Sequence, residues 1–547
     1  MNSAATHDPA STPGGSPALD AIIIGAGLAG LYQLHCLRDR LGLSVQVLET
    51  GGGVGGTWYW NRYPGARCDS ESHAYGFSFS EELMRDWDWT ERFPEQKEIL
   101  RYIDHFADRF DLRRSIRFNA RVSAAHYNDA TNRWELRTAS GESFSAKFLI
   151  TAVGCLSAAN VPTIAGLDSF QGQWYHTGQW PHEGVNFAGK RVGLIGTGST
   201  GIQAAPVIAE TAQHLSVFQR SPTYSVPARN APWTAEFKRY VKENAAEIRR
   251  ATHATPSGHP FANSERLALQ TPPQERQAIY EAAWRKGGVE FRTAFGDIML
   301  NKEANDTAAE FVRNKILQIV KDPVTAHKLT DIDHPYAGKR PPVDTDYYET
   351  FNRDNVSLVD VRAAPIEEIT AAGIRTRDGH YPLDIIVFAT GYDALTGPLL
   401  RMDIRGRSGR LLADDWKDGP RSYLGLQMEG FPNLFTITGP GSPSVLTNMP
   451  VAIEQHSDWI ADCIAHMRAQ GLERIEPQAQ AMGDWMLKVT EAASATLLST
   501  ATTSWYLGAN VPGKPRVFMP YSGGMARYRK ICADVATNGY EGFRFSS

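Results

Sequence analysis

The sequence predicts an α/β fold made of two similar units, each with a buried strand that turns sharply into a helix. Two short apolar runs, at residues 21–24 and 192–195, are each followed by glycines in the spacing G-x-G-x-x-G. Glycine suits these positions because the chain turns tightly and its backbone must approach a pyrophosphate closely. The repeat therefore predicts two Rossmann-like dinucleotide-binding domains. The residues expected at the two pyrophosphates are Gly25, Gly27 and Gly30 in the first unit, and Gly196, Gly198, Ser199 and Gly201 in the second.

Residues of opposite charge follow the second strand of each unit. Glu49 and Arg220 stand at the same offset from the first glycine of their own unit. A carboxylate accepts hydrogen bonds from a ribose diol, whereas a guanidinium binds a 2′-phosphate through two hydrogen bonds. The first unit is therefore predicted to bind FAD and the second NADPH. The alternative is that one unit keeps its glycines only to pack a helix on a strand.

The composition excludes several classes of protein. A chain of 547 residues is too long for one hydrophobic core, so about two to four domains are expected. A net charge of −4 offers no basic surface for nucleic acid or for an anionic membrane. No run reaches the roughly 18 apolar residues of a membrane-spanning helix. Residues 1–18 lack the features of a signal peptide, so we expect a disordered tail and a cytoplasmic protein.

The five cysteines lie far apart and contain no Cys-x-x-Cys pair. No histidine stands near them at the spacing of a zinc site, so neither a disulfide scaffold nor a bound metal is expected. Flavoprotein disulfide reductases also bind two dinucleotides, but they need a redox-active cysteine pair. The cysteine pattern therefore excludes that class.

Two similar apolar segments indicate where each unit ends. Residues 147–154 and 384–391 both finish in a small residue and a glycine, as expected of buried parallel strands near a cofactor. Between them, a charged, alanine-rich stretch with helical spacing predicts an insertion that shields the cleft between domains. The predicted domains are FAD-binding (19–155 and 390–547), NADP-binding (156–230 and 335–389) and a helical insertion (231–334).

Two longer motifs carry a family resemblance. Residues 170–181, FQGQWYHTGQWP, match the pattern F-x-G-x-x-x-H-T-x-x-W-P, and residues 55–69 match G-G-x-W-x-x-x-x-[FY]-P-G-x-x-x-D. The chain resembles the type I Baeyer–Villiger monooxygenases, class B flavoproteins, and within them the phenylacetone, steroid and cyclic-ketone enzymes. The related flavin-containing and N-hydroxylating monooxygenases have a shorter fingerprint that typically lacks the final Trp-Pro, which is present here as Trp180 and Pro181.

The resemblance implies a reaction and two catalytic residues. Oxygen insertion beside a ketone carbonyl, giving an ester or lactone, requires an anionic peroxide, which reduced flavin supplies as a C4a-peroxide formed with O₂. A nearby cation keeps the peroxide deprotonated and stabilises the oxyanion that forms on the ketone. By resemblance this cation is Arg340, and Asp69 holds it in place. On local grounds alone, a surface arginine beside prolines would be the better interpretation of Arg340, and the match to the family favours the catalytic one.

The resemblance also assigns residues to the cofactors and to the substrate. Lys339 would support Arg220 and Ser221 at the 2′-phosphate of NADPH, as a flexible charge beside a bidentate one. Trp505 would touch NADP and substrate, although an ordinary buried aromatic is an equal alternative. His176 is expected to fix the linker between domains by hydrogen bonding. The remaining assignments are Gly56, Thr57 and Trp58 against the flavin, with Asp69 and Arg340 also at the cofactors, and Ser444, Val445 and Leu446 in a pocket for bulky, aryl or cyclic ketones.

Three other functions fit parts of the pattern. The same flavin chemistry could oxygenate sulfides or amines, or the chain could be an NADPH oxidase or quinone reductase that needs no ketone. A protein that binds both nucleotides without turning them over is the third alternative. The expected partners are a small-molecule ketone and O₂, and the expected state is a monomer or weak homo-oligomer.

Overall fold

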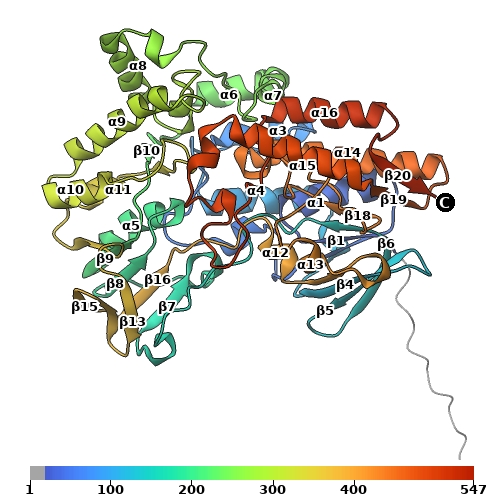
Figure 1. Cartoon of the computed structure of the whole chain (residues 1–547), viewed down its shortest axis with the longest axis horizontal. Helices are drawn as coiled ribbons and strands as arrows, with labels where there is room; N and C mark the ends of the chain where they lie inside the picture. Colours follow the sequence, from blue (N-terminus) through green and yellow to red (C-terminus); the bar gives the residue numbers. More distant parts are fainter. Residues whose placement is uncertain (1–18) are drawn as a thin grey trace, which may run out of the picture.

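The computed structural model describes residues 19–547, and the tail predicted for residues 1–18 lies outside this range. Two large β-sheets lie side by side, and helices pack against both of them (Figure 1). This mixed α/β architecture with parallel strands confirms the predicted fold class.

The first sheet is built around the strand that precedes the first glycine run. β1 is parallel to both of its neighbours, β2 and β6, and its apolar side chains are buried. The strand order is β17 (Asp403–Arg405), β4 (Val122–Asn128), β5 (Arg133–Thr138), β6 (Ser143–Thr151), β1 (Leu19–Ile24), β2 (Val45–Leu48) and β3 (Ile116–Arg117), with β18 (Leu434–Thr436) also beside β6.

This sheet also contains an antiparallel meander, which the glycine motif does not predict. β4, β5 and β6 pair antiparallel to one another, while β17 and β18, from far downstream, pair parallel to β4 and β6. Side chains of β5 alternate between buried and more exposed, as expected where one face of an antiparallel sheet meets solvent. The chain after residue 390 therefore rejoins the first sheet.

The second sheet contains only parallel strands and carries the second glycine run after β8. β16, from the repeated apolar segment at 384–391, lies beside β8, so this distant segment completes the sheet. The strand order is β12 (Val356–Asp360), β9 (His214–Gln219), β8 (Arg191–Ile195), β16 (Ile385–Phe388) and β7 (Gln173–His176). Smaller sheets are formed by β13 (Ile366–Thr370), β14 (Gly373–Thr376) and β15 (Gly379–Pro382), by β10 (Val226–Pro227) with β11 (Val343–Asp344), and by β19 (Arg474–Pro477) with β20 (Phe543–Ser546).

Helices fill the segment between β10 and β11. Figure 1 shows them in green and yellow-green, grouped beyond the second sheet. They are α6 (Ala235–Glu243), α7 (Ala245–Ala254), α8 (Pro273–Lys286), α9 (Lys302–Ile319) and α10 (Pro323–Thr330). The domain boundaries given by the sequence stay a prediction.

The C-terminal helices pack over the first unit. α14 packs against α1 and against α16, and its buried apolar residues share one core with those of β1 and α1 (Figure 1). No helix within residues 19–547 is both long and apolar enough to cross a membrane. The main helices outside the insertion are α1 (Leu28–Leu34), α2 (Thr57–Trp60), α3 (Glu81–Asp86), α4 (Gln96–Arg109), α5 (Ser199–Thr211), α11 (Tyr347–Thr350), α12 (Gly397–Leu400), α13 (Leu412–Asp415), α14 (Met449–Ala469), α15 (Ala479–Ser494) and α16 (Met525–Thr537).

Candidate active site

The first glycine of each run meets the same kind of neighbour. Gly25 has φ +103°, and a Cβ there would lie 2.5 Å from the carbonyl oxygen of Ala152. Gly196 has φ +111°, and a Cβ there would lie 2.4 Å from the carbonyl oxygen of Ala389. A side chain is therefore excluded by backbone conformation and by space. The repeated apolar segments are thus the strands against which both turns pack.

The other glycines shape the helix starts. A Cβ on Gly30 would lie 1.8 Å from the oxygen of Gly25, and one on Gly201 would lie 2.1 Å from the oxygen of Gly196. Both α1 and α5 begin at a glycine with no side-chain cap, which leaves backbone N–H groups available. Such a helix start binds the phosphates of a dinucleotide. Both sites therefore have the shape and the donors that FAD and NADPH require.

Glu49 is buried beside the first glycine run. Its carboxylate accepts hydrogen bonds from the backbone N–H groups of Ala26, at 2.7 Å, and Gly51, at 2.6 Å. Burial raises the pKa of Glu49, and these hydrogen bonds oppose the increase. The same contacts hold the carboxylate at the edge of the predicted FAD site, where it can also accept from a ribose hydroxyl.

The motif at residues 55–69 touches both units. A Cβ on Gly56 would lie 2.9 Å from the Cα of Gly27, so the motif begins against the first glycine run. Further along, a Cβ on Gly65 would lie 2.3 Å from the backbone oxygen of Gln203 on α5, and the Tyr63 hydroxyl donates to the Gln203 side chain at 2.8 Å. The motif therefore spans the distance between the two predicted cofactor sites.

Asp69, the last residue of this motif, holds Arg340. The Arg340 Nε donates to one carboxylate oxygen at 2.8 Å and Nη2 donates to the other at 2.6 Å, while Nη1 donates to the Val445 carbonyl at 3.2 Å. Burial alone would raise the pKa of Asp69, but the Arg340 charge and hydrogen bonds lower it overall. Asp69 in turn raises the pKa of Arg340 despite its desolvation. The guanidinium is thus fixed in place and always charged.

Sequence reasoning missed His259, which lies beside this pair. Its Nδ1 is 3.0 Å from the Ser257 carbonyl oxygen and its Nε2 is 3.0 Å from the Ser70 hydroxyl. Because a carbonyl only accepts, Nδ1 carries the proton and Nε2 accepts from Ser70. Burial, followed by the charges of Arg292 and Arg340, lowers the pKa of His259 to about 3. The imidazole is therefore neutral and leaves the Asp69 charge to Arg340.

A narrow cavity opens beside Arg340. Its volume is about 10 Å³, which is enough for about one water molecule and less than a ketone occupies. Of the three predicted substrate residues, Leu446 lines this cavity. Ser444 does not, because it is fully buried and its hydroxyl donates to the Thr438 carbonyl at 3.0 Å. Val445 contributes its carbonyl to Arg340.

Arg220 and Lys339 approach each other beside the second glycine run. Burial lowers the pKa of Lys339, and the charge of Arg220 lowers it further. Arg220 is exposed and makes no ion pair with any carboxylate in residues 19–547. Ser221 accepts a hydrogen bond at its carbonyl from Thr197, within the glycine run, at 3.0 Å. The two cations assigned to the 2′-phosphate therefore lie close enough to repel each other.

The other predicted residues are placed as follows. Trp505 is partly exposed, and its ring lies 4.5 Å from that of Tyr506. Burial raises the pKa of the Tyr506 phenol to about 12, against the nearby charges of Arg340 and Arg292. Trp58 is buried and donates to the Tyr75 hydroxyl at 3.1 Å, while its neighbour Thr57 is exposed. Tyr506 is therefore a second residue that the motifs did not identify.

The motif at residues 170–181 packs closely against the chain around residues 384–392. A Cβ on Gly172 would lie 2.4 Å from the Asp384 oxygen, and one on Gly178 would lie 2.6 Å from the Tyr392 ring. His176 accepts from the Gly178 backbone N–H at 3.0 Å, and burial lowers its pKa to about 4. A neutral histidine inside the linker fits the predicted hydrogen-bonding role better than an acid–base role.

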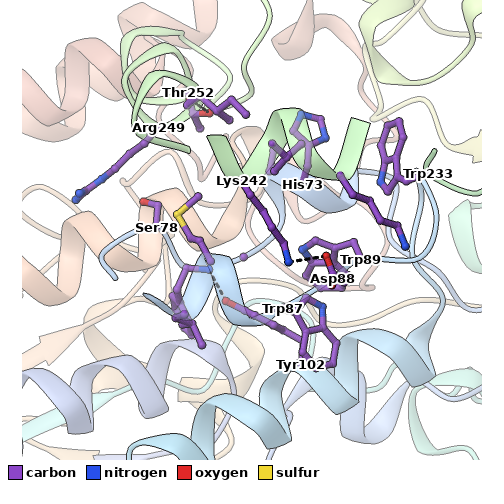
Figure 2. Close-up of a pocket in the computed structure, with 18 of the residues that line it drawn as sticks. His73, Ser78, Trp87, Asp88, Trp89, Tyr102, Trp233, Lys242, Arg249 and Thr252 are labelled. Carbon is purple, nitrogen blue, oxygen red and sulfur yellow. Dashed lines mark hydrogen bonds and ion pairs between the residues drawn. The ribbon is translucent and has the colours of Figure 1, made fainter. Parts of the chain in front are cut away.

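A larger cavity of about 70 Å³ lies where the first unit meets the helical segment (Figure 2). Trp87, Trp89 and Trp233 line it, and Lys242 forms an ion pair with Asp88 across it at 2.9 Å. Neither Arg340 nor any glycine of the two runs lines this cavity. It is therefore separate from the Arg340 site.

The cysteines form no disulfide, and the described part of the chain holds no metal-binding cluster. All five cysteines are buried and free, namely Cys36, Cys68, Cys155, Cys463 and Cys532. Within residues 19–547, no group of three or more His, Cys, Asp or Glu side chains is arranged to hold a metal ion.

Comparisons with known proteins place this geometry in a family. Residues 19–239 match the family model described as flavin-binding monooxygenase-like. The chain is 44% identical over 541 residues to 2-oxo-Δ³-4,5,5-trimethylcyclopentenylacetyl-CoA monooxygenase of Pseudomonas putida, covering 97% of this chain and 99% of that protein. It is 43% identical to cyclohexanone 1,2-monooxygenase of an Acinetobacter species, with 96% of each chain covered.

A solved structure agrees over the same length. Oxidized steroid monooxygenase bound to NADP superposes with a TM-score of 0.92 and 50% identity, covering 97% of this chain and 99% of that one. The relatives indicate the same family as the geometry, which has two dinucleotide-binding units with the Arg340–Asp69 pair between them. The chain belongs to the Baeyer–Villiger monooxygenases, a group of flavin-binding monooxygenases.

Proposed function

We propose that this enzyme uses FAD, NADPH and O₂ to insert one oxygen atom beside a ketone carbonyl, giving an ester or lactone. The observation that carries the proposal is the bidentate contact of Arg340 with Asp69, at 2.6 and 2.8 Å, on a motif that touches the first glycine run and α5, the helix that follows the second run. The Arg340 charge is thus held between the two cofactor sites.

The chain's own residues fit both cofactors. In this proposal the FAD site would contain Gly25, Gly27 and Glu49, and the NADPH site would contain Gly198 and Arg220. When bound, NADPH would supply a hydride and FAD would supply the electrons that activate O₂. The protein supplies position, charge and exclusion of water.

Arg340 stabilises the negative charge that develops when the carbonyl of the ketone is attacked. A cation already fixed by Asp69 needs no reorganisation during the reaction, so its full electrostatic effect lowers the barrier. The Val445 carbonyl, which accepts from the same guanidinium, couples the loop beside Leu446 to this charge. Opening of that loop would admit the ketone, and its closing would then exclude water.

The substrate class that we propose is a bulky, aryl or cyclic ketone. The relatives named for a cyclopentenylacetyl-CoA, for cyclohexanone and for a steroid support it, as does the pocket residue Leu446. The direct test is incubation with NADPH, ¹⁸O₂ and a panel of such ketones. We expect an ester or lactone with one ¹⁸O atom per molecule and one NADPH oxidised per product.

Other outcomes would favour the alternatives. NADPH oxidation that yields only hydrogen peroxide would indicate an oxidase, and exclusive conversion of sulfides or amines would indicate a heteroatom oxygenase. A bound flavin that NADPH does not bleach would indicate a nucleotide-binding protein without turnover. Each result contradicts ketone oxygenation.

We expect the Arg220→Ala/Lys339→Ala double variant to lose its preference for NADPH. Removing two cations at the 2′-phosphate costs binding only for the cofactor that carries this phosphate. The KM for NADPH should rise by about tenfold or more, while the KM for NADH changes little. Steady-state kinetics with both cofactors measures this, and equal increases in the two KM values would remove these residues from the phosphate site.

A further inference from the structure

A second arginine, Arg292, lines the same cavity as Arg340. It lies in a short 3₁₀ turn, Val289–Thr293, which follows α8 in the helical segment. His259, Leu446 and Arg340 also line this cavity. The helical segment thus places a second guanidinium beside the catalytic one.

The charge of Arg292 is not matched by any acidic side chain in the part of the chain that the structure describes. No carboxylate within residues 19–547 lies within ion-pair distance of it, and no side-chain hydrogen bond to it is formed. The nearby acidic group, Asp69, is already bound through both oxygens to Arg340. His259 is neutral, so the site holds two guanidinium charges against one carboxylate.

An unmatched cation in a confined site is costly. Desolvation lowers the pKa of Arg292, and repulsion from Arg340 lowers it further. An arginine nevertheless stays charged near neutral pH, so the cost is relieved best by an anion that enters the cavity. The rest of the lining includes Val226, Val289 and Leu446, which are apolar.

We propose that Arg292 is a specificity-determining residue that binds a carboxylate on the ketone substrate. An apolar body packed against Leu446 and a carboxylate at Arg292 would leave the carbonyl facing Arg340. A carboxylate matches the planar guanidinium through two hydrogen bonds and is smaller than a phosphate or a sulfate. The catalytic consequence of this inference rests on the proposed ketone oxygenation. The binding of a carboxylate does not depend on that proposal.

The binding step is tested without turnover. Cyclohexanecarboxylate and cyclohexanecarboxamide have the same ring, and neither is a ketone. With the FAD enzyme saturated with NADP⁺, titration calorimetry should show that wild type binds the carboxylate about tenfold or more tightly than the amide. Arg292→Met should remove this preference and Arg292→Lys should keep part of it. Arg285→Met, at an exposed arginine of α8, is the matched control and should behave as wild type.

Two results would overturn the binding step. Equal binding of carboxylate and amide by wild type would show that the cavity does not select anions. A preference that survives in Arg292→Met, with flavin content and Tm unchanged, would place the anion elsewhere.

The catalytic consequence is tested with 4-oxocyclohexane-1-carboxylate and its methyl ester. In wild type kcat/KM should favour the carboxylate, and Arg292→Met should lower kcat/KM for it by about tenfold or more, with little change for the ester. An equal loss for both ketones would mean that Arg292 acts on the reaction, and a rise only in the KM for NADPH would assign it to the cofactor. Both results overturn the proposal. Carboxylate binding without oxygenation of any ketone would instead contradict the proposed function and keep the anion site.

Discussion

The Arg340→Met protein is expected to oxidise NADPH but to form almost no ester. Methionine keeps much of the length of the side chain and removes the guanidinium that binds both oxygens of Asp69. Loss of one preorganised group that stabilises an oxyanion costs about 10²- to 10³-fold in rate. We therefore expect flavin bleaching by NADPH to persist, while the ester formed per NADPH falls by at least this factor.

The measurement is an anaerobic mixing with NADPH, followed by oxygen and a ketone, with the flavin spectrum and the product recorded together. Arg340→Lys is the control, because lysine keeps a charge but cannot bind both Asp69 oxygens in the same way. It should recover part of the ester yield. Ester formation by Arg340→Met at the wild-type rate would exclude Arg340 from the reaction.

Local sequence patterns predicted the strands and glycine turns around the site, but not the pairing of Asp69 with Arg340. The strands before both glycine runs, and the buried segments against which the glycines pack, lie where the periodicity placed them. These features are local, because a tight turn constrains nearby residues in a recognisable way. By contrast, Asp69 and Arg340 come together from opposite halves of the chain. Only the resemblance to the family paired these two residues, since an arginine beside prolines is otherwise interpreted as a surface residue.

The site residues that the sequence did not predict were missed for one reason. His259, Arg292 and Tyr506 reach the site from loops and short 3₁₀ turns whose course no periodicity specifies. Their charge state is likewise decided by burial and by neighbours from other segments. Periodicity also fails to specify the direction of Ser444. It is only two residues before Leu446, yet it is fully buried in the core and does not line the cavity.

Gly198→Ala and Gly201→Ala are expected to fail in opposite ways, although they lie three residues apart. A Cβ on Gly198 meets no atom within 4 Å, and its φ of −82° suits any residue. The variant should therefore fold and melt like wild type. Its new methyl group nevertheless stands where the backbone must approach a pyrophosphate, so NADPH should bind about tenfold or more weakly.

A Cβ on Gly201, by contrast, would lie 2.1 Å from the oxygen of Gly196, which is backbone and cannot move without opening the turn between β8 and α5. Alanine gains only about 1 kcal/mol over glycine within a helix, too little to offset this overlap. Gly201→Ala should therefore lower the Tm by several degrees, about 2–4 °C for each kcal/mol lost in a domain of 150–250 residues. Thermal melts and NADPH titrations of both variants separate the two effects. A stable Gly201→Ala protein, or an unstable Gly198→Ala protein, would contradict the roles of these glycines.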